Sequence, residues 1–299
     1  MTDFAKLKKN RSFEQLTKAL ENTQQNSDAG SKKNDDRYWQ PTVDKAGNGM
    51  AIIRFLPAPA VDGDDALPWV RIFNHGFQGP GGWLIDNCLT TTNDKCPVCE
   101  HNSMLWNSGV EANKEIVRKQ KRKLSYIANI LVVSDPSNPE NEGKVFLFKY
   151  GKKIFDKITE AMNPEFADET PINPFDLWDG ANFKLKIRQV EGYRNYDKSE
   201  FSDASSLLDG DDAKLEALWK SEHSLKEFLE KSNFKSYDDL KKRLDKALGL
   251  EGAINLRTKA EDVEVADTFK EDDLKVFSKA STATEDDDLD YFKSLAESD

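Results

Sequence analysis

One histidine and all three cysteines of the chain fall within a window of 25 residues, at His75, Cys88, Cys96 and Cys99. Their spacing is H-x12-C-x7-C-x2-C, and the last two cysteines form a Cys-Pro-Val-Cys knuckle. Two thiolates separated by two residues can bind one tetrahedral Zn2+ ion, and two ligands from nearby strands can complete the coordination. Such a site ties four points of the chain together, so this window constrains the fold strongly. We expect one structural Zn2+ with no open coordination position.

The sequence of this window also allows two other interpretations. The cysteines could be buried thiols beside a surface histidine, or Cys96 and Cys99 could be a redox pair. A redox pair belongs at the strand-to-helix turn of a βαβ pattern, which residues 81–99 do not resemble. His101 could compete with His75 as the fourth ligand, but His75 lies in a predicted strand opposite the knuckle.

Cysteine number and charge distribution bear on the compartment and the domain organisation. Three cysteines cannot all pair in disulfides, which favours a reducing cytoplasm. We find no apolar run of membrane-spanning length and no signal-peptide pattern, so we expect a protein that is not secreted and has no membrane partner. The net charge is −11, yet residues 261–299 hold 14 acidic and 4 basic residues, whereas residues 1–34 hold 7 basic and 4 acidic ones. We therefore expect a basic N-terminal arm (1–36), a near-neutral core (37–255) and a disordered acidic C-terminal tail (256–299).

Hydrophobic periodicity predicts a mainly β core with helices, an α+β fold. Strands are expected at residues 37–43, 50–56, 69–77, 83–88, 125–133, 144–150 and 182–190. Helices are expected at residues 12–24, 97–106 and 152–162, and residues 213–248 are expected to be mostly helical.

Basic and aromatic residues are interleaved around these predicted strands. Five of the six residues at 118–123 are basic, which is most often only a solvated loop. Here the run leads directly into an aromatic strand, and single-stranded nucleic acid is bound by basic grooves lined with stacking rings. Phe146, Phe148 and Tyr150 share one strand face, which is either core or such a stacking platform. The candidate residues for contact with nucleic acid are Trp83, Trp106, Lys121, Arg122, Lys123, Tyr126, Phe148, Lys149, Tyr150, Tyr193, Arg194 and Tyr196.

Sequence signatures of catalysis are missing. The chain contains neither a phosphate-binding Gly-x4-Gly-Lys-Ser/Thr loop nor a Gly-x-Ser-x-Gly elbow. The zinc deaminase pattern H-x-E fails, because Gly76 and Phe77 follow His75. We therefore expect a binding protein and not an enzyme. The alternatives are a zinc-dependent nuclease or deaminase, and a scaffold whose acidic tail is the functional part.

Several blocks in order along the chain point to a family. They lie at residues 44–49, 54–57, 74–77, 96–99, 121–123, 126–133, 139–146, 151–154 and 195–197. Together, from about residue 44 to 201, they resemble the T-even bacteriophage single-stranded DNA-binding proteins, also called helix-destabilising proteins. Outside that range the resemblance rests on layout: basic arm, core and acidic tail.

The resemblance implies a zinc-containing OB-fold core with a DNA cleft, in which the Cys3His ligands map onto His75, Cys88, Cys96 and Cys99. It implies that the arm, here Lys8, Lys9, Arg11 and Ser12, mediates head-to-tail self-association along the strand. It also implies a tail that contacts replication, recombination and repair proteins, such as a polymerase, a helicase loader and a recombinase, in the cytoplasm of an infected bacterial host.

This chain departs from the family pattern at three points. Ile127 stands where the relative has a tryptophan, and Phe148 replaces a tyrosine. Asn10 interrupts the basic run of the arm.

Overall fold

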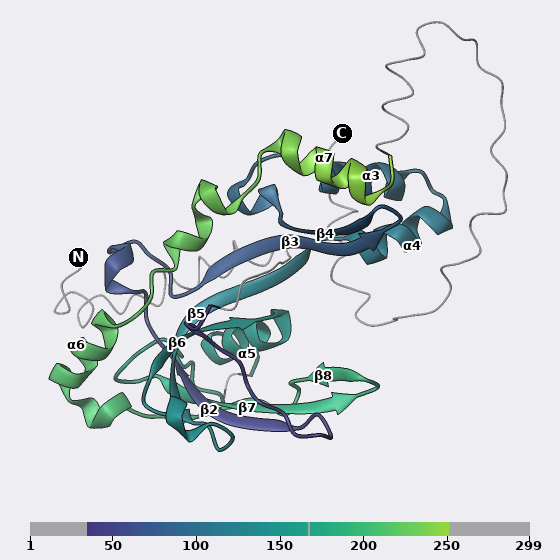
Figure 1. Cartoon of the computed structure of the whole chain (residues 1–299). Helices are drawn as coiled ribbons and strands as arrows, with labels where there is room; N and C mark the ends of the chain where they lie inside the picture. The colour runs from purple at the N-terminus through teal and green to yellow at the C-terminus, as the bar shows by residue number, and fades with distance from the viewer. Residues whose placement is uncertain (1–34, 167, 251–299) are drawn as a thin grey trace, which may run out of the picture.

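The computed structural model of the chain describes residues 35–166 and 168–250 (Figure 1). The predicted arm residues Lys8, Lys9, Arg11 and Ser12, the predicted helix at 12–24 and the predicted tail at 256–299 lie outside the described residues, so those expectations remain predictions.

The described part is built on one nine-stranded sheet, in which the main path of pairing runs β1-β6-β5-β2-β7-β8. β3 joins it by pairing with β5 and β4, and β9 joins it by pairing with β7. All pairs are antiparallel except β1 with β6. The strands are β1 Tyr38–Trp39, β2 Gly49–Phe55, β3 Val70–Gly79, β4 Gly82–Asn87, β5 Lys123–Ser134, β6 Val145–Tyr150, β7 Ala181–Val190, β8 Tyr193–Asn195 and β9 Glu200–Ala204.

Strand β5 connects two parts of the molecule. Its first residues, from Lys123 to Ile127, pair with β3, whereas Ile130 to Ser134 pair with β2. Residues 125–132 are buried without interruption, as expected for a strand covered on both faces. The strand therefore fixes the β3–β4 hairpin relative to the β2–β7 part of the sheet.

The main hydrophobic core lies between the sheet and helix α5 (Lys152–Met162). Phe155 of this helix stacks on Tyr126 of β5, with ring centroids 3.8 Å apart and planes 4° from parallel. Along β7, Phe183, Leu185 and Ile187 are buried and alternate with partly exposed residues, which confirms the predicted half-buried strand.

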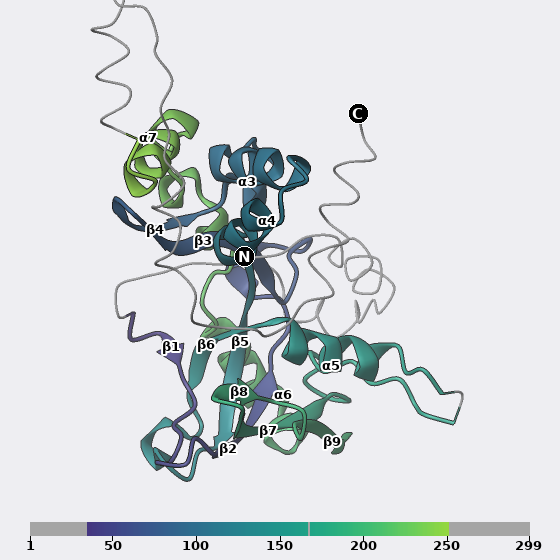
Figure 2. The same ribbon diagram turned by 90° about the vertical axis from the view of Figure 1, so that its right-hand side faces the viewer.

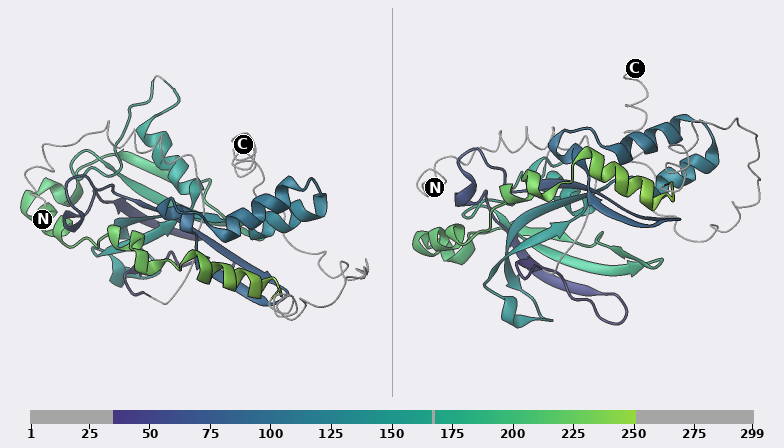
Figure 3. Two further views of the ribbon diagram at one scale, coloured as in Figure 1. Left: turned by 90° about the horizontal axis from the view of Figure 1, so that it is seen from above. Right: turned by 45° about the horizontal axis from the view of Figure 1, so that its top comes forward.

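A second core lies on one face of the β3–β4 hairpin, under helices α3 (Pro97–Asn107) and α7 (Tyr237–Ala247). Figures 1 and 3 show both helices beside the hairpin, together with α4 (Glu111–Gln120). Leu240, Leu244 and Ala247 of α7 are buried there against residues of β3 and β4. We call this unit of β3, β4, α3, α4 and α7 the hairpin module.

The tip of the hairpin packs tightly against the end of α7. Gly81 N–H donates to the carbonyl of Ala247 at 2.9 Å. A Cβ added to Gly81 would lie 1.8 Å from the Lys246 carbonyl oxygen, and one added to Gly79 would lie 2.3 Å from that of Ala247. Only glycine permits this approach of two backbones.

The expected α+β class is confirmed, while the OB-fold assignment remains a prediction. The strand predictions hold except at residues 37–43, where β1 is only Tyr38–Trp39. Residues 213–248 contain α6 (Asp212–Lys220) and α7, with short 3-10 turns between them. None of the helices in the described residues is long and apolar enough to cross a lipid bilayer.

Candidate metal centre and nucleic-acid interface

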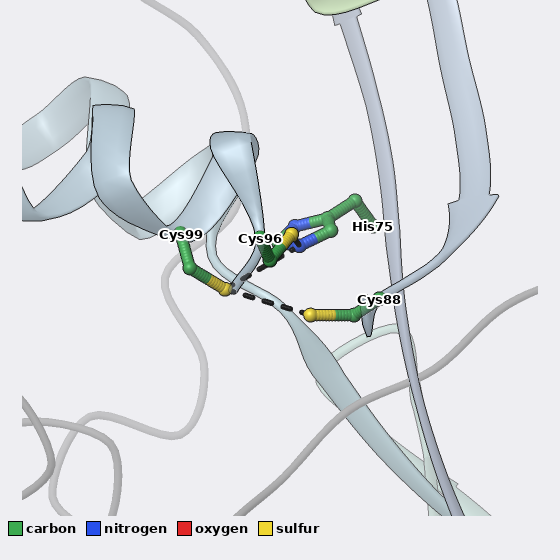
Figure 4. Close-up of side chains that lie close together, drawn as sticks. All are labelled: His75, Cys88, Cys96 and Cys99. Carbon is green, nitrogen blue, oxygen red and sulfur yellow. Dashed lines mark hydrogen bonds between the residues drawn. The ribbon is translucent and has the colours of Figure 1, made fainter. Parts of the chain in front are cut away.

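The four predicted metal ligands come from three elements of the hairpin module. His75 lies on β3, Cys88 follows the end of β4, Cys96 precedes the first turn of α3, and Cys99 lies in that turn (Figure 4). Pro97 occupies the first position of α3, where its missing N–H is not needed. The knuckle thus starts a helix whose first turn faces the end of the hairpin.

The ligand atoms of these four residues lie within 4.8 Å of one another. Cys88 Sγ is 3.5 Å from Cys99 Sγ, and His75 Nε2 is 3.5 Å from Cys96 Sγ and 3.6 Å from Cys99 Sγ. A tetrahedral Zn2+ site with Zn–S near 2.3 Å and Zn–N near 2.0 Å has S···S edges of about 3.8 Å and S···N edges of about 3.5 Å. The donor set therefore fits a tetrahedral metal ion. His101 is not part of the group.

The surroundings fix the histidine for this role. His75 Nδ1 donates to the carbonyl of Gln120 at 3.3 Å, which leaves Nε2 as the ring nitrogen directed at the thiols. Asn102 Nδ2 donates to the same carbonyl at 3.1 Å. Burial alone lowers the pKa of the His75 imidazole, but the thiol groups of Cys88 and Cys96 outweigh it and raise that pKa to about 9. Binding of a metal ion through Nε2 requires loss of the proton from this nitrogen.

The opposite face of the hairpin is open. Residues directly across β3 and β4 share a face, so Gln78 and Trp83 lie on one side with Gly76 and Ile85, and His75 lies on the other. The Trp83 side chain is 63 % exposed and Ile85 is 39 % exposed. A Cβ added to Gly76 would meet nothing within 4 Å. Lys123 Nζ, on the neighbouring strand, lies 3.4 Å from the Gly76 carbonyl. This open face of β3–β4 thus combines an exposed indole with a lysine.

The other candidate DNA-binding residues divide into exposed and buried groups. Lys149, Tyr193 and Arg194 are exposed, the last two on β8, while Lys121 and Tyr196 are half-buried. Trp106 is half-buried on α3, with the charged groups of Lys114 and Arg118 within 6 Å of its ring.

Four candidates are buried, so they offer little surface for the direct DNA contact that was predicted for them. Tyr126, Phe148 and Tyr150 are 2, 3 and 4 % exposed and belong to the main core, where α5 covers their face of the sheet. The face shared by Phe148 and Tyr150 is therefore core and not a stacking platform. Arg122 is only 7 % exposed. Burial also raises the pKa of the Tyr126 phenol, which favours its neutral form.

Comparison with known proteins agrees with this organisation. Residues 47–248 match the model of the family described as gp32 DNA binding protein like. The chain belongs to this family. It is 41 % identical over 270 residues to the single-stranded DNA-binding protein of Enterobacteria phage T2, covering 86 % of this chain and 85 % of the relative. It is 40 % identical over 274 residues to the protein of the same name from Enterobacteria phage T4, covering 88 % and 86 %.

The gp32-like match includes the whole metal centre, and also features that the sequence reasoning missed. Helix α4 was not predicted, and residues 118–120 form its last turn instead of a loop. The sequence feature that could have predicted α4 is a set of opposite charges at helical spacing. Glu111 pairs with Lys114 and Arg118, and Glu115 pairs with Arg118. Strand β9 was not predicted either. The sequence also did not predict that Thr90 contacts Cys88 and that the Gln120 carbonyl accepts from His75, because no sequence pattern marks these two residues.

Proposed function

We propose that this chain binds single-stranded DNA with little sequence preference and catalyses no reaction. The observation that carries the proposal is membership of the gp32-like family, with relatives named as single-stranded DNA-binding proteins at 40–41 % identity over most of the chain. Rings stack on any base and lysines pair with any phosphate, so such contacts tolerate every sequence.

We assign the principal contact surface to the open face of β3–β4 and to β8. Trp83 offers a stacking surface beside Lys123, and Tyr193 with Arg194 repeats this aromatic–basic combination on β8. The β3–β4 hairpin and the β7–β8 hairpin project toward the same side of the molecule (Figures 1 and 2). Lys121, directly after α4, and Lys149 on β6 add positive charge. A single strand that touches both hairpins would be held by bases at two points and by phosphates between them.

We propose that the metal is one Zn2+ ion with a structural role. Three thiolates and one imidazole are soft and borderline ligands that suit Zn2+, and four protein ligands leave no position for a catalytic water. When bound, the ion crosslinks β3, the end of β4 and α3. His75, Cys88, Cys96 and Cys99 hold it and thereby order the hairpin that carries Trp83. The closed ligand set is evidence against the alternative of a zinc-dependent nuclease or deaminase.

We propose further roles for the terminal segments on the family resemblance. Residues 1–36, with Lys8, Lys9, Arg11 and Ser12, are proposed to mediate cooperative head-to-tail association on long strands. Residues 256–299 are proposed to recruit replication and recombination proteins in the host cytoplasm. The charge of the two segments supports these assignments. Residues 1–34 and 256–299 lie outside the described residues.

Quenching of tryptophan fluorescence by oligo-dT tests the main proposal. We expect saturable quenching, and an affinity that falls with salt at a log–log slope of about −0.7 per neutralised phosphate. Incubation of labelled single strands with the metal-loaded protein should leave them intact. An affinity that does not change with salt, or cleavage or deamination of the strand, would overturn the proposal.

A further inference from the structure

The metal ligand Cys88 has a hydroxyl neighbour that links it to the basic segment. Thr90 Oγ1 lies 3.1 Å from Cys88 Sγ. The same oxygen accepts a hydrogen bond from Arg122 Nη1 at 2.5 Å. One hydroxyl thus joins a metal ligand to a residue predicted to contact DNA, across 32 positions of sequence.

The chemistry of the three groups fixes the direction of this chain. A guanidinium has five N–H donors and no acceptor, so Arg122 donates and Thr90 Oγ1 accepts. The Thr90 hydroxyl proton is then available to Cys88 Sγ. A donated hydrogen bond stabilises a sulfur in its thiolate form, which is the form that binds metal. Arg122 therefore supports the metal site through Thr90.

The guanidinium of Arg122 is held in the interior of the hairpin module. It lies over the ring of Phe73, with Cζ 4.6 Å from the ring centroid, and Arg71 Cζ lies 5.1 Å from the same centroid. The backbone carbonyl of Phe73 in turn accepts from Cys88 N–H at 2.7 Å. With 7 % of its surface exposed, Arg122 presents little of its charge to a phosphate.

A second link reaches the same segment from the other side of the site. The Gln120 carbonyl that accepts from His75 Nδ1 belongs to the residue directly before Lys121. The backbone of residue 120 and the side chain of residue 122 are thus both tied to metal ligands. Lys121, which lies between residues 120 and 122, is half-buried, and Lys123, which follows Arg122, is exposed.

We propose that Thr90 and Arg122 are positioning residues that couple the metal centre to the basic segment at residues 121–123, and that Arg122 does not bind phosphate. The metal ion, once bound, sets where Lys121 and Lys123 point. Coupling between two ligands is reciprocal, so single-stranded DNA held by these lysines tightens metal binding by the same factor. The DNA half of this inference rests on the proposed DNA binding, whereas the metal half rests on the proposed metal site and the geometry of its four ligands.

Four variants of the full chain test the coupling: Thr90→Val, Thr90→Ser, Arg122→Met and, as the exposed matched control, Lys123→Met. Zn2+ affinity is measured by chelator competition without DNA, and affinity for oligo-dT is measured against salt. Loss of a hydrogen-bonding partner of a metal ligand weakens metal binding about 10–100-fold. We expect this loss for Thr90→Val and Arg122→Met, and near-complete recovery for Thr90→Ser.

Lys123→Met should show the opposite pattern, with unchanged Zn2+ affinity and a salt slope smaller by about 0.7. Arg122→Met should keep the parent salt slope when saturated with Zn2+. A reduced slope with unchanged metal affinity would make Arg122 a phosphate contact and overturn the inference. Should Arg122→Met fail to fold, parent-like Zn2+ affinity in Thr90→Val would overturn it equally. If the parent protein does not bind oligo-dT, the proposed function is refuted. The Zn2+ affinities of the variants would then still test the role of Thr90.

Discussion

Substitution of Gly81 by alanine tests how firmly α7 holds the hairpin that carries Trp83 and His75. The new Cβ would lie 1.8 Å from the Lys246 carbonyl oxygen and 3.0 Å from Gly249 N, so the hairpin tip and the end of α7 must move apart. Both contacts are backbone atoms, which cannot turn aside as a flexible side chain would.

The cost follows from two contributions. Forcing extra volume into a tightly packed site costs about 1–3 kcal/mol. Separation also weakens the hydrogen bond from Gly81 N–H to Ala247, which contributes about 1 kcal/mol. We expect Gly81→Ala to lower the free energy of unfolding by about 2–4 kcal/mol, and the thermal midpoint by roughly 5–15 °C.

Urea unfolding of the Zn2+-saturated protein measures this change, and Gly76→Ala is the matched control. Gly76 lies on the same hairpin, but a Cβ there would meet nothing within 4 Å. The control should therefore be at least as stable as the parent, because alanine loses less conformational freedom than glycine in a strand. If Gly81→Ala unfolds within 0.5 kcal/mol of the parent, the docking of α7 does not stabilise the hairpin.

Three further predictions concern binding, pH and the metal. Trp83→Ala should weaken oligo-dT binding by about 1–3 kcal/mol in equilibrium titrations, while the urea midpoint stays unchanged. The control is Met104→Ala on α3, where the side chain is similarly exposed; it should change neither the oligo-dT affinity nor the urea midpoint. Burial raises the pKa of the Glu222 carboxyl well above its usual value, so the stability that this carboxyl contributes is complete below about pH 4.5 and is lost as pH rises through its folded-state pKa. The unfolding free energy of Glu222→Gln, relative to that of the parent, should therefore be larger at pH 8 than at pH 5. An equal difference at the two pH values would refute this reasoning. Chelation of the metal should lower the calorimetric midpoint, and so should its release on acidification, when the cysteine thiolates and the His75 imidazole take up protons. An unchanged midpoint would show that the centre does not stabilise the fold.

Much of the fold followed from local patterns. The alternation of Phe183, Leu185 and Ile187 predicted a half-buried strand because successive side chains of a strand point to opposite faces, and β7 buries these three. The spacing of His75, Cys88, Cys96 and Cys99 predicted a four-ligand set because few arrangements of a short chain bring four such groups together.

Burial was harder to predict than secondary structure. The apolar and aromatic character of β6 was evident, but periodicity only states which side chains share a face. Whether the face of Phe148 and Tyr150 meets solvent or another element depends on α5, which packs its Phe155 onto Tyr126 beside them. Arg54 makes the same point: fully buried, it donates to the carbonyls of Asp176 and Ser205, which are more than 120 positions away.

By itself, then, the sequence determined the candidate metal ligands, the strand pattern and the opposite charge of the two ends, because each is encoded by residues close together in the chain. The tertiary structure alone decided which aromatic rings are exposed, that Arg122 lies inside beside Thr90, and that glycines at the hairpin tip meet the end of α7. Those properties depend on contacts between segments distant in sequence, and such contacts are fixed only when the whole core packs.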